Sequence, residues 1–306
     1  MAGIVVSGGT YSGSGDVTAQ FVTALSGGTF IATPDTTILY GENTGGHIID
    51  IYADSTLTNS SGLFILSSST DTGIWTKGTG NLYDCILVSG ATGGGTDYDF
   101  NYNIVIDNDL TVGAGCDFSS NTQWKRPTIV GDVLLSGTFQ KANSAEYDIT
   151  LGSLTIAAGG RYYAPVSSKS TIITSKSAAE YALKNSTSGV FTHNSGTVEI
   201  TTNGYLNLDM GGDPLYNFTW LGTSEQRCQR ALSIEGDFIV SSSGVGYFRP
   251  NNNSLTVDGN VTIKTGGEIR CDSANHSFGS LSIDSGGEYS ATDGTTTITS
   301  DNASDY

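Results

Sequence analysis

The fold is decided by a stretch that occurs twice. Residues 152–164 read Gly-Ser-Leu-Thr-Ile-Ala-Ala-Gly-Gly-Arg-Tyr-Tyr-Ala, and residues 279–291 read Gly-Ser-Leu-Ser-Ile-Asp-Ser-Gly-Gly-Glu-Tyr-Ser-Ala, with eight of thirteen positions identical. The shared template is a turn residue, a polar residue, an apolar–polar–apolar triplet, a polar gap with glycine, and a further apolar or aromatic position. The triplet has the two-residue period of a half-buried β-strand. The glycines supply the backbone freedom that a sharp corner needs.

Further copies of the template define a period. They start at residues 108, 131, 152, 196, 236, 259 and 279, so that the steps are 23, 21, 44, 40, 23 and 20 residues. Weaker strand patterns at 170–174 and 216–220 fill the two double steps. A unit of two or three short strands cannot bury its apolar face alone, whereas stacked units share a continuous core. We therefore predict an all-β fold, a parallel right-handed β-helix (β-solenoid) with coils of about 20–23 residues.

Other repeat folds agree less well with this pattern. A leucine-rich repeat of similar length would show a helix-forming half and an asparagine motif, and neither is present. A propeller blade needs about 40 residues in four antiparallel strands, which disagrees with the single steps near 21 residues. An ice-binding face would need Thr-x-Thr on every coil, whereas the template has no threonine at a fixed position.

Two regions are expected along the chain: an irregular β-rich N-terminal or capping region over residues 1–100, and the β-solenoid over residues 101–306. In the first region apolar groups recur at spacings that drift from about 11 to 22 residues, which fits either distorted coils or a separate cap. A short capping helix is predicted at 15–25, where Phe21, Val22 and Leu25 have helical spacing, and another at 177–184.

Composition excludes several classes of protein. Lys and Arg number 13 against 30 Asp and Glu, a net charge of −17, which argues against a nucleic-acid partner. No run reaches the roughly 18 apolar residues of a membrane helix, so membrane insertion is not expected. The start of the chain lacks the basic and apolar regions of a secretory signal peptide. The four cysteines form no CxxC pair and are expected to be buried apolar residues, not zinc ligands or disulfides.

Two pairs of carboxylates are candidates for chemistry, Asp97 with Asp99 and Asp107 with Asp109. A carbohydrate-cleaving β-helix needs paired carboxylates, or calcium held by Asp. Asp97 and Asp99 lie two residues apart in a predicted strand, so their side chains share one face about 7 Å apart. We name them as candidate calcium ligands, calcium being the only cofactor considered, and name no catalytic residue. The competing interpretation is that Asp is common at solenoid turns and on solvent-facing positions.

Aromatic residues are the second candidate feature. The tyrosines that follow glycine at equivalent template positions are Tyr162, Tyr163, Tyr247 and Tyr289. They are predicted to form either an internal or lateral aromatic ladder, or an exposed face that binds a ligand or an oligomer partner. The tryptophans at 75, 124 and 220 are candidate sugar-stacking platforms or core residues. The histidines at 47, 193 and 276 stand alone, and no metal site is predicted from them.

Residues 187–300 resemble the repetitive β-helical regions of filamentous-haemagglutinin-like bacterial adhesins and of phage virion appendage proteins. The strings that carry the resemblance are residues 189–200, 215–220, 231–240 and 254–263. It implies a β-helix with an outward-facing binding or structural role, and it brings no catalytic motif. The implied function is a non-enzymatic virion structural or appendage protein (tail spike, tail fibre or capsid-surface protein) that presents a rigid rod for attachment or decoration.

The same resemblance implies a homo-oligomer, by analogy a trimer, located in the virion. Its implied partners are other virion proteins or a cell-surface glycan. One alternative is a bacterial surface adhesin or matrix module at the cell surface, and another is a polysaccharide lyase or hydrolase. The absent signal peptide favours the virion protein over the secreted adhesin. The acidic surface implies local, specific contacts with anionic cell surfaces, not electrostatic attraction.

Overall fold

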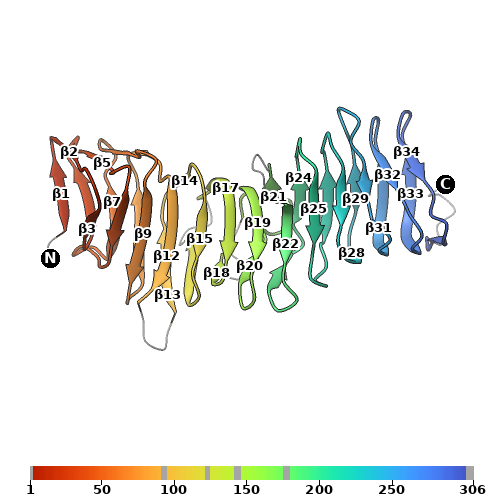
Figure 1. Ribbon diagram of the computed structural model, residues 1–306, viewed down its shortest axis with the longest axis horizontal. Coiled ribbons are helices and arrows are strands. Elements are labelled where there is room, and N and C mark those ends of the chain that lie inside the picture. Colours follow the sequence, from red (N-terminus) through yellow and green to blue (C-terminus); the bar gives the residue numbers. More distant parts are fainter. Residues whose placement is uncertain (1–2, 91–94, 121–124, 141–145, 175–179, 301–306) are drawn as a thin grey trace. The chain divides into compact units, whose positions relative to one another are not determined.

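The computed structural model describes residues 3–90, 95–120, 125–140, 146–174 and 180–300. The chain forms a β-solenoid of about 13 turns with coils of roughly 22 residues (Figure 1). About 53% of it is strand in all-parallel sheets, with no helix among the described residues. The predicted fold class is confirmed. The chain divides into two compact units, Met1–Ile149 with Gly159–Tyr163, and Thr150–Ala158 with Ala164–Tyr306.

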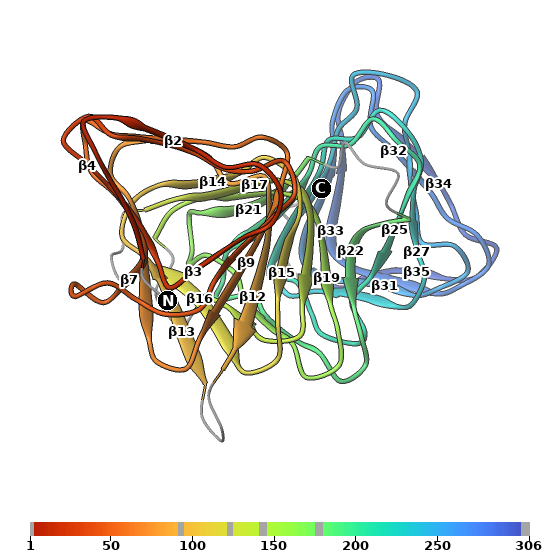
Figure 2. The same cartoon turned by 60° about the vertical axis from the view of Figure 1, so that its left-hand side comes forward.

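In the first unit, strands of successive coils stack in parallel columns, which Figure 2 shows from a second direction. One column, here named sheet A, contains β1 (Ile4–Ser7), β4 (Val22–Leu25), β7 (His47–Ile51), β10 (Thr72–Thr76), β13 (Thr96–Phe100), β16 (Cys116–Ser120), β18 (Thr138–Phe139) and β20 (Arg161–Tyr163). A second contains β2 (Thr10–Ser12), β5 (Thr29–Ile31), β8 (Thr56–Thr58) and β11 (Thr79–Gly80). A third contains β3 (Val17–Ala19), β6 (Thr36–Leu39), β9 (Leu63–Ser68), β12 (Asp84–Ser89) and β15 (Leu110–Val112). β14 (Ile104–Ile106) and β15 pair with the two halves of β17 (Pro127–Leu135), which spans a corner.

The second unit repeats this arrangement, again with corner-spanning strands. One column contains β21 (Ser170–Ile173), β24 (Thr197–Ile200), β26 (Asn217–Trp220), β29 (Phe238–Val240) and the second halves of β31 (Leu255–Ile263) and β33 (His276–Ile283). Another contains β22 (Tyr181–Asn185), β25 (Leu206–Asp209), β27 (Gln226–Cys228), β30 (Phe248–Arg249), β32 (Glu268–Arg270) and β34 (Glu288–Ser290). The remaining strands are β19 (Ile149–Ile156), β23 (Val190–Thr192), β28 (Leu232–Ile234) and β35 (Thr296–Ile298).

The register between coils is the register of the sequence template. Phe238 pairs with Val261, and Val261 pairs with Leu281, all at the first apolar position of the triplet. The weak pattern at 216–220 is strand β26, where Phe218 pairs with Phe238 and fills one double step. Equivalent template positions therefore lie above one another, because each coil buries the same side chains in a shared interior.

The interior contains rows of stacked aromatic rings. In the first unit Phe118 lies 4.8 Å from Phe100 and 5.4 Å from Phe139, and Phe139 lies 5.6 Å from Tyr162, between ring centroids. In the second unit the rings of Phe218 and Phe238 stack at 5.1 Å, but belong to a separate row. Rings at such separations gain both burial and favourable ring–ring contact, which ties each coil to the next.

Both helices predicted from local spacing are wrong where the structure describes them. Residues 17–19 and 22–25 form β3 and β4, and residues 181–185 form β22, whereas 177–179 lie outside the described residues. Val22 pairs with Ile49, and Leu183 pairs with Leu154 and Leu208. Pairing with neighbouring coils and burial of these side chains outweigh a helical spacing supported by only a few residues.

The strands between residues 4 and 89 pair in parallel from coil to coil, as the later strands do. The boundary predicted at residue 100 stays a prediction. Cys85, Cys116 and Cys228 are buried and Cys271 is half-buried, all as free thiols, which agrees with small apolar residues. Across the described ranges, no helix is long and apolar enough to span a membrane.

Candidate functional site

A β-bulge on sheet A brings two polar side chains together on one face. Gly73 of β10 pairs with His47 of β7, but the next residue, Ile74, pairs with Ile49, so that Ile48 is an extra residue in β7. Residues three apart in a regular strand point to opposite faces. The bulge resets that alternation, and the Nδ1 of His47 and the Oδ2 of Asp50 lie 3.3 Å apart.

A short loop before β7 fixes this pair. The amide of Asn43 donates through Nδ2 to Asp50 Oδ2 at 3.1 Å and to Thr23 Oγ1 at 3.2 Å. Its Oδ1 accepts the backbone N–H groups of Gly45 and His47. His47 and Asp50 are only 9% and 7% exposed. Asn43 and His47 both bond Oδ2 of Asp50 and so fix the orientation of the carboxylate. Its other oxygen, Oδ1, has no hydrogen-bond partner among the described residues.

The indole of Trp75 lies against the imidazole of His47, with ring centroids 3.9 Å apart. Gly73 allows the two rings to approach this closely. Any Cβ at this position would lie 2.5 Å from His47 Cδ2 and 3.1 Å from Trp75 Nε1, which is too close. Trp75 is half-buried, and its Nε1 is buried with no hydrogen-bond partner in the described part of the chain. Leaving a buried N–H without a partner destabilises the folded state by roughly 1–3 kcal/mol. The ring contact with His47 offsets part of this cost.

Two hollows adjoin at these rings. The larger, of about 350 Å³, is lined by Val5, Phe21, Thr23, Leu25, Asn43, Thr44, Gly45, His47, Asp50, Tyr52 and Trp75. The smaller, of about 210 Å³, is lined by Gly46, His47, Asp71, Thr72, Gly73, Trp75, Asp99 and Asn101. Both lie on sheet A of the first unit, whose strands β4, β7, β13 and β16 are labelled in Figure 2. We name the two together the Trp75 groove.

The predicted calcium pair lies on β13, the strand of sheet A that pairs with β10. Asp97 and Asp99 alternate with buried residues in β13 and share its outer face, as predicted from their spacing. The backbone N–H of Asp97 donates to Asp71 Oδ1 at 3.1 Å, and Asp99 Oδ1 accepts from Ser119 Oγ at 3.0 Å. Within the described ranges no three His, Cys, Asp or Glu side chains are grouped to hold a metal. Calcium binding stays a prediction.

The four predicted tyrosines occupy different environments. Tyr162 is fully buried and belongs to the interior aromatic row, whereas Tyr163 is half-buried. Tyr289 is half-buried against Phe278 and donates or accepts a 2.7 Å hydrogen bond with Thr296. Tyr247 lies under the guanidinium of Arg270, at 3.7 Å from the ring centroid. None of the four lines the Trp75 groove, and the tryptophan at 124 lies outside the described residues.

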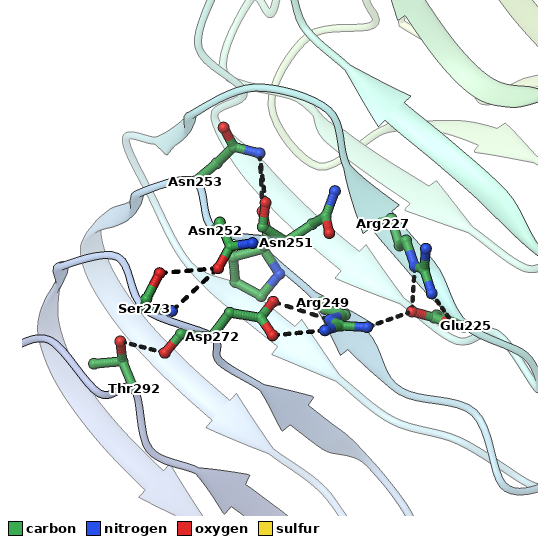
Figure 3. Close-up of polar contacts among 10 residues, drawn as sticks. Glu225, Arg227, Arg249, Asn251, Asn252, Asn253, Asp272, Ser273 and Thr292 are labelled. Atoms are coloured by element: carbon green, nitrogen blue, oxygen red, sulfur yellow. Dashed lines mark hydrogen bonds and ion pairs between the residues drawn. The ribbon is translucent and has the colours of Figure 1, made fainter.

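A second polar cluster, shown in Figure 3, lies in the second unit. Arg227 and Arg249 occupy paired positions on β27 and β30. Arg249 donates to both oxygens of Asp272, at 2.9 and 2.6 Å, and its NH1 lies 3.6 Å from Glu225 Oε1. Arg227 pairs with the same Glu225. Because every one of these cations has a carboxylate partner, we interpret the cluster as a tie between coils.

The pKa values in this cluster follow its geometry. The hydrogen bonds from Arg249 hold the pKa of Asp272 below its usual range, against the opposing effect of burial. Burial would raise the pKa of Glu225, but hydrogen bonds from Arg227 and Tyr247 together with the charge of Arg249 leave it lowered. Both groups are thus stabilised as carboxylates, as expected for acids bonded to cations.

In the sequence, His47 and Trp75 stand twenty-eight residues apart and share no motif. The bulge at Ile48 joins them, and nothing in the local sequence marks it, because the first hundred residues have no constant period. A usable signal was the glycine pair before the histidine and the single glycine before Trp75, which permit a tight loop and a close ring contact. Comparison with protein-family models, with curated proteins and with solved structures found no match to this chain.

Proposed function

We propose that this chain is a non-enzymatic structural or appendage protein of a virion, a tail spike, tail fibre or capsid-surface protein that presents rigid β-helical coils for attachment or decoration. The observation that carries the proposal is the difference between the inward-facing and outward-facing positions of the coils. Buried positions repeat from coil to coil as apolar and aromatic rows, while outward positions differ in residue type. Such a scaffold keeps its fold when the outward-facing residues change.

The proposal includes a homotrimer in the virion, with other virion proteins or a cell-surface glycan as partners. The sequence resemblance in residues 187–300 supports this part. The adhesin stays an alternative, and the carbohydrate-cleaving β-helix has less support because the resemblance brings no catalytic motif.

The test is the native mass by light scattering, with negative-stain images of the same sample. A stable trimer, or incorporation of the chain into virion particles, is the expected result. A monomer at all concentrations tested, together with absence from purified particles, would overturn the proposal. The mass is measured before any mutagenesis, because buried side chains do not indicate the oligomeric state.

A further inference from the structure

We infer that the Trp75 groove binds a neutral saccharide unit, stacked against Trp75 and hydrogen-bonded by Asp50 and the acids of the smaller hollow. The inference deepens the proposed attachment function, because a glycan contact is one way in which such a protein attaches. It names the site and the ligand class of that attachment, and so it rests on the proposed function.

The shape of the groove suits a small ligand. The larger hollow, at about 350 Å³, lies at the lower end of the range for sites that hold small molecules. Its wall combines an aromatic plane with a few fixed polar groups, and such a mixture gives orientation as well as affinity. A pyranose ring has this amphipathic form, with a face of C–H groups and a rim of hydroxyls.

The groove offers a carboxylate acceptor that is already aligned. Asp50 is held by Asn43 and His47 through Oδ2, so its free Oδ1 is positioned without further ordering. Ionised carboxylates only accept hydrogen bonds, and sugar hydroxyls donate them. Binding to a prepared acceptor avoids much of the entropy cost of fixing a mobile side chain.

The charges of the groove select against other ligands. Asp50 lines the larger hollow, Asp71 and Asp99 line the smaller one, and no Lys or Arg lines either. An anionic sugar would face like charges at short range, which is unfavourable. A metal ion would need converging ligands, whereas among the described side chains no three acidic, His or Cys groups converge. Acceptors spread along a groove match several hydroxyls of one neutral ligand.

The experiment begins with the wild-type chain on an array of neutral, acidic and amino-sugar oligosaccharides. Calorimetric titration then uses the neutral oligosaccharide that binds best, with three variants. Trp75→Ala and Asp50→Asn are each expected to weaken binding at least about tenfold, which corresponds to about 1.4 kcal/mol. Tyr40→Ala removes an aromatic side chain that is 38% exposed but outside the groove, and is expected to leave affinity unchanged.

Thermal melting checks that each variant is folded. If Trp75→Ala does not fold, Asp50→Asn decides the outcome, because it preserves the shape of the side chain. Binding of acidic or amino sugars only, no binding of any saccharide, or neutral-sugar binding that both variants leave unchanged would overturn the inference. The native mass and the particle content do not depend on these results, so a failure of the groove is distinguishable from a failure of the proposed function.

Discussion

Replacing Arg249 with methionine is expected to destabilise the second unit, although the side chain lies at the surface. Arg249 is the residue that joins three coils: it bonds Asp272 on the following coil and approaches Glu225 on the preceding one. Methionine keeps much of the aliphatic packing and removes the charge. Asp272, with its side chain 19% exposed, then loses its two hydrogen bonds from Arg249 and keeps the one from the Asn252 backbone.

The size of the effect lies between two limits. Hydrogen bonds to charged groups contribute about 1.5–3 kcal/mol when they are buried, whereas exposed ion pairs contribute about 0–1 kcal/mol. The Arg249 side chain is 32% exposed, so we expect Arg249→Met to lose about 1–2 kcal/mol. For a cooperative body of about 150–250 residues, each kcal/mol lowers the Tm by about 2–4 °C.

Arg270→Met is the matched control. Arg270 lies on the next coil, and its ion-pair partner is Glu268, two residues away; its side chain is 48% exposed and also interacts with Tyr247. It makes no link between coils by ion pairing in the described structure, although it covers the Tyr247 ring. Removing it is expected to lower the Tm by less than half as much as Arg249→Met.

The assay is thermal and urea unfolding of both variants between pH 7 and pH 2.5. Because Arg249 lowers the pKa of Asp272 in the folded state, the wild type binds fewer protons than the unfolded chain below about pH 5. The stability that Arg249 supplies is thus complete at pH 7 and is lost as the pH falls through the folded pKa. The two variants should converge with the wild type at acidic pH. Equal losses for the two variants, or a loss independent of pH, would refute the reasoning.

Three further outcomes are expected. Phe118→Ala removes a ring from the middle of an interior row and should cost about 3–5 kcal/mol, measured by urea unfolding; a loss below 1 kcal/mol would show that the row is not continuous. Burial lowers the pKa of His276, whose Nδ1 accepts the N–H of Leu255, so the wild type should lose stability as the pH falls below about 6.5, and His276→Gln should lack that loss in melting curves at pH 7.5 and 5. Burial above all raises the pKa of Asp109, which accepts the Asp132 N–H; Asp109→Asn keeps the acceptor and should raise or preserve the Tm at pH 7, with the difference vanishing near pH 4, and a lower Tm at pH 7 would contradict this.

The features that depend on the stacking of coils, namely the fold class, the coil length and the strand register, could be predicted from the sequence. The alternation around Leu154 and Ile156 recurs at a constant period, and a period is a direct consequence of equal coils sharing one core. Both side chains are fully buried, and the template positions of later coils pair in the predicted register. Where the pattern was judged over a few residues only, as at Phe21 and Val22, pairing with other coils decided the structure and the helical prediction failed.

The groove could not be predicted in the same way. It depends on one extra residue, Ile48, which changes the face that the following side chains occupy, and on ring contacts between His47 and Trp75, twenty-eight residues apart. A periodic argument assumes that every coil is equivalent, whereas this site exists because one coil is not. Asp97 and Asp99 were correctly placed on one face, since that prediction needed only the alternation within a strand.

A solenoid therefore separates stability from recognition more cleanly than a globular core does. Inward positions are constrained by the coils on both sides, so a change there alters the whole stack. Outward positions are constrained only where they meet another side chain, and the chain uses them in two ways. In the second unit, paired charges around Arg249 satisfy one another and leave no free cation in the cluster. In the first unit, Asp50 keeps an oxygen without a partner in the described structure, beside a half-buried indole. An outward cluster that is internally satisfied stabilises the coils, and one that is aligned but unsatisfied is suited to a ligand.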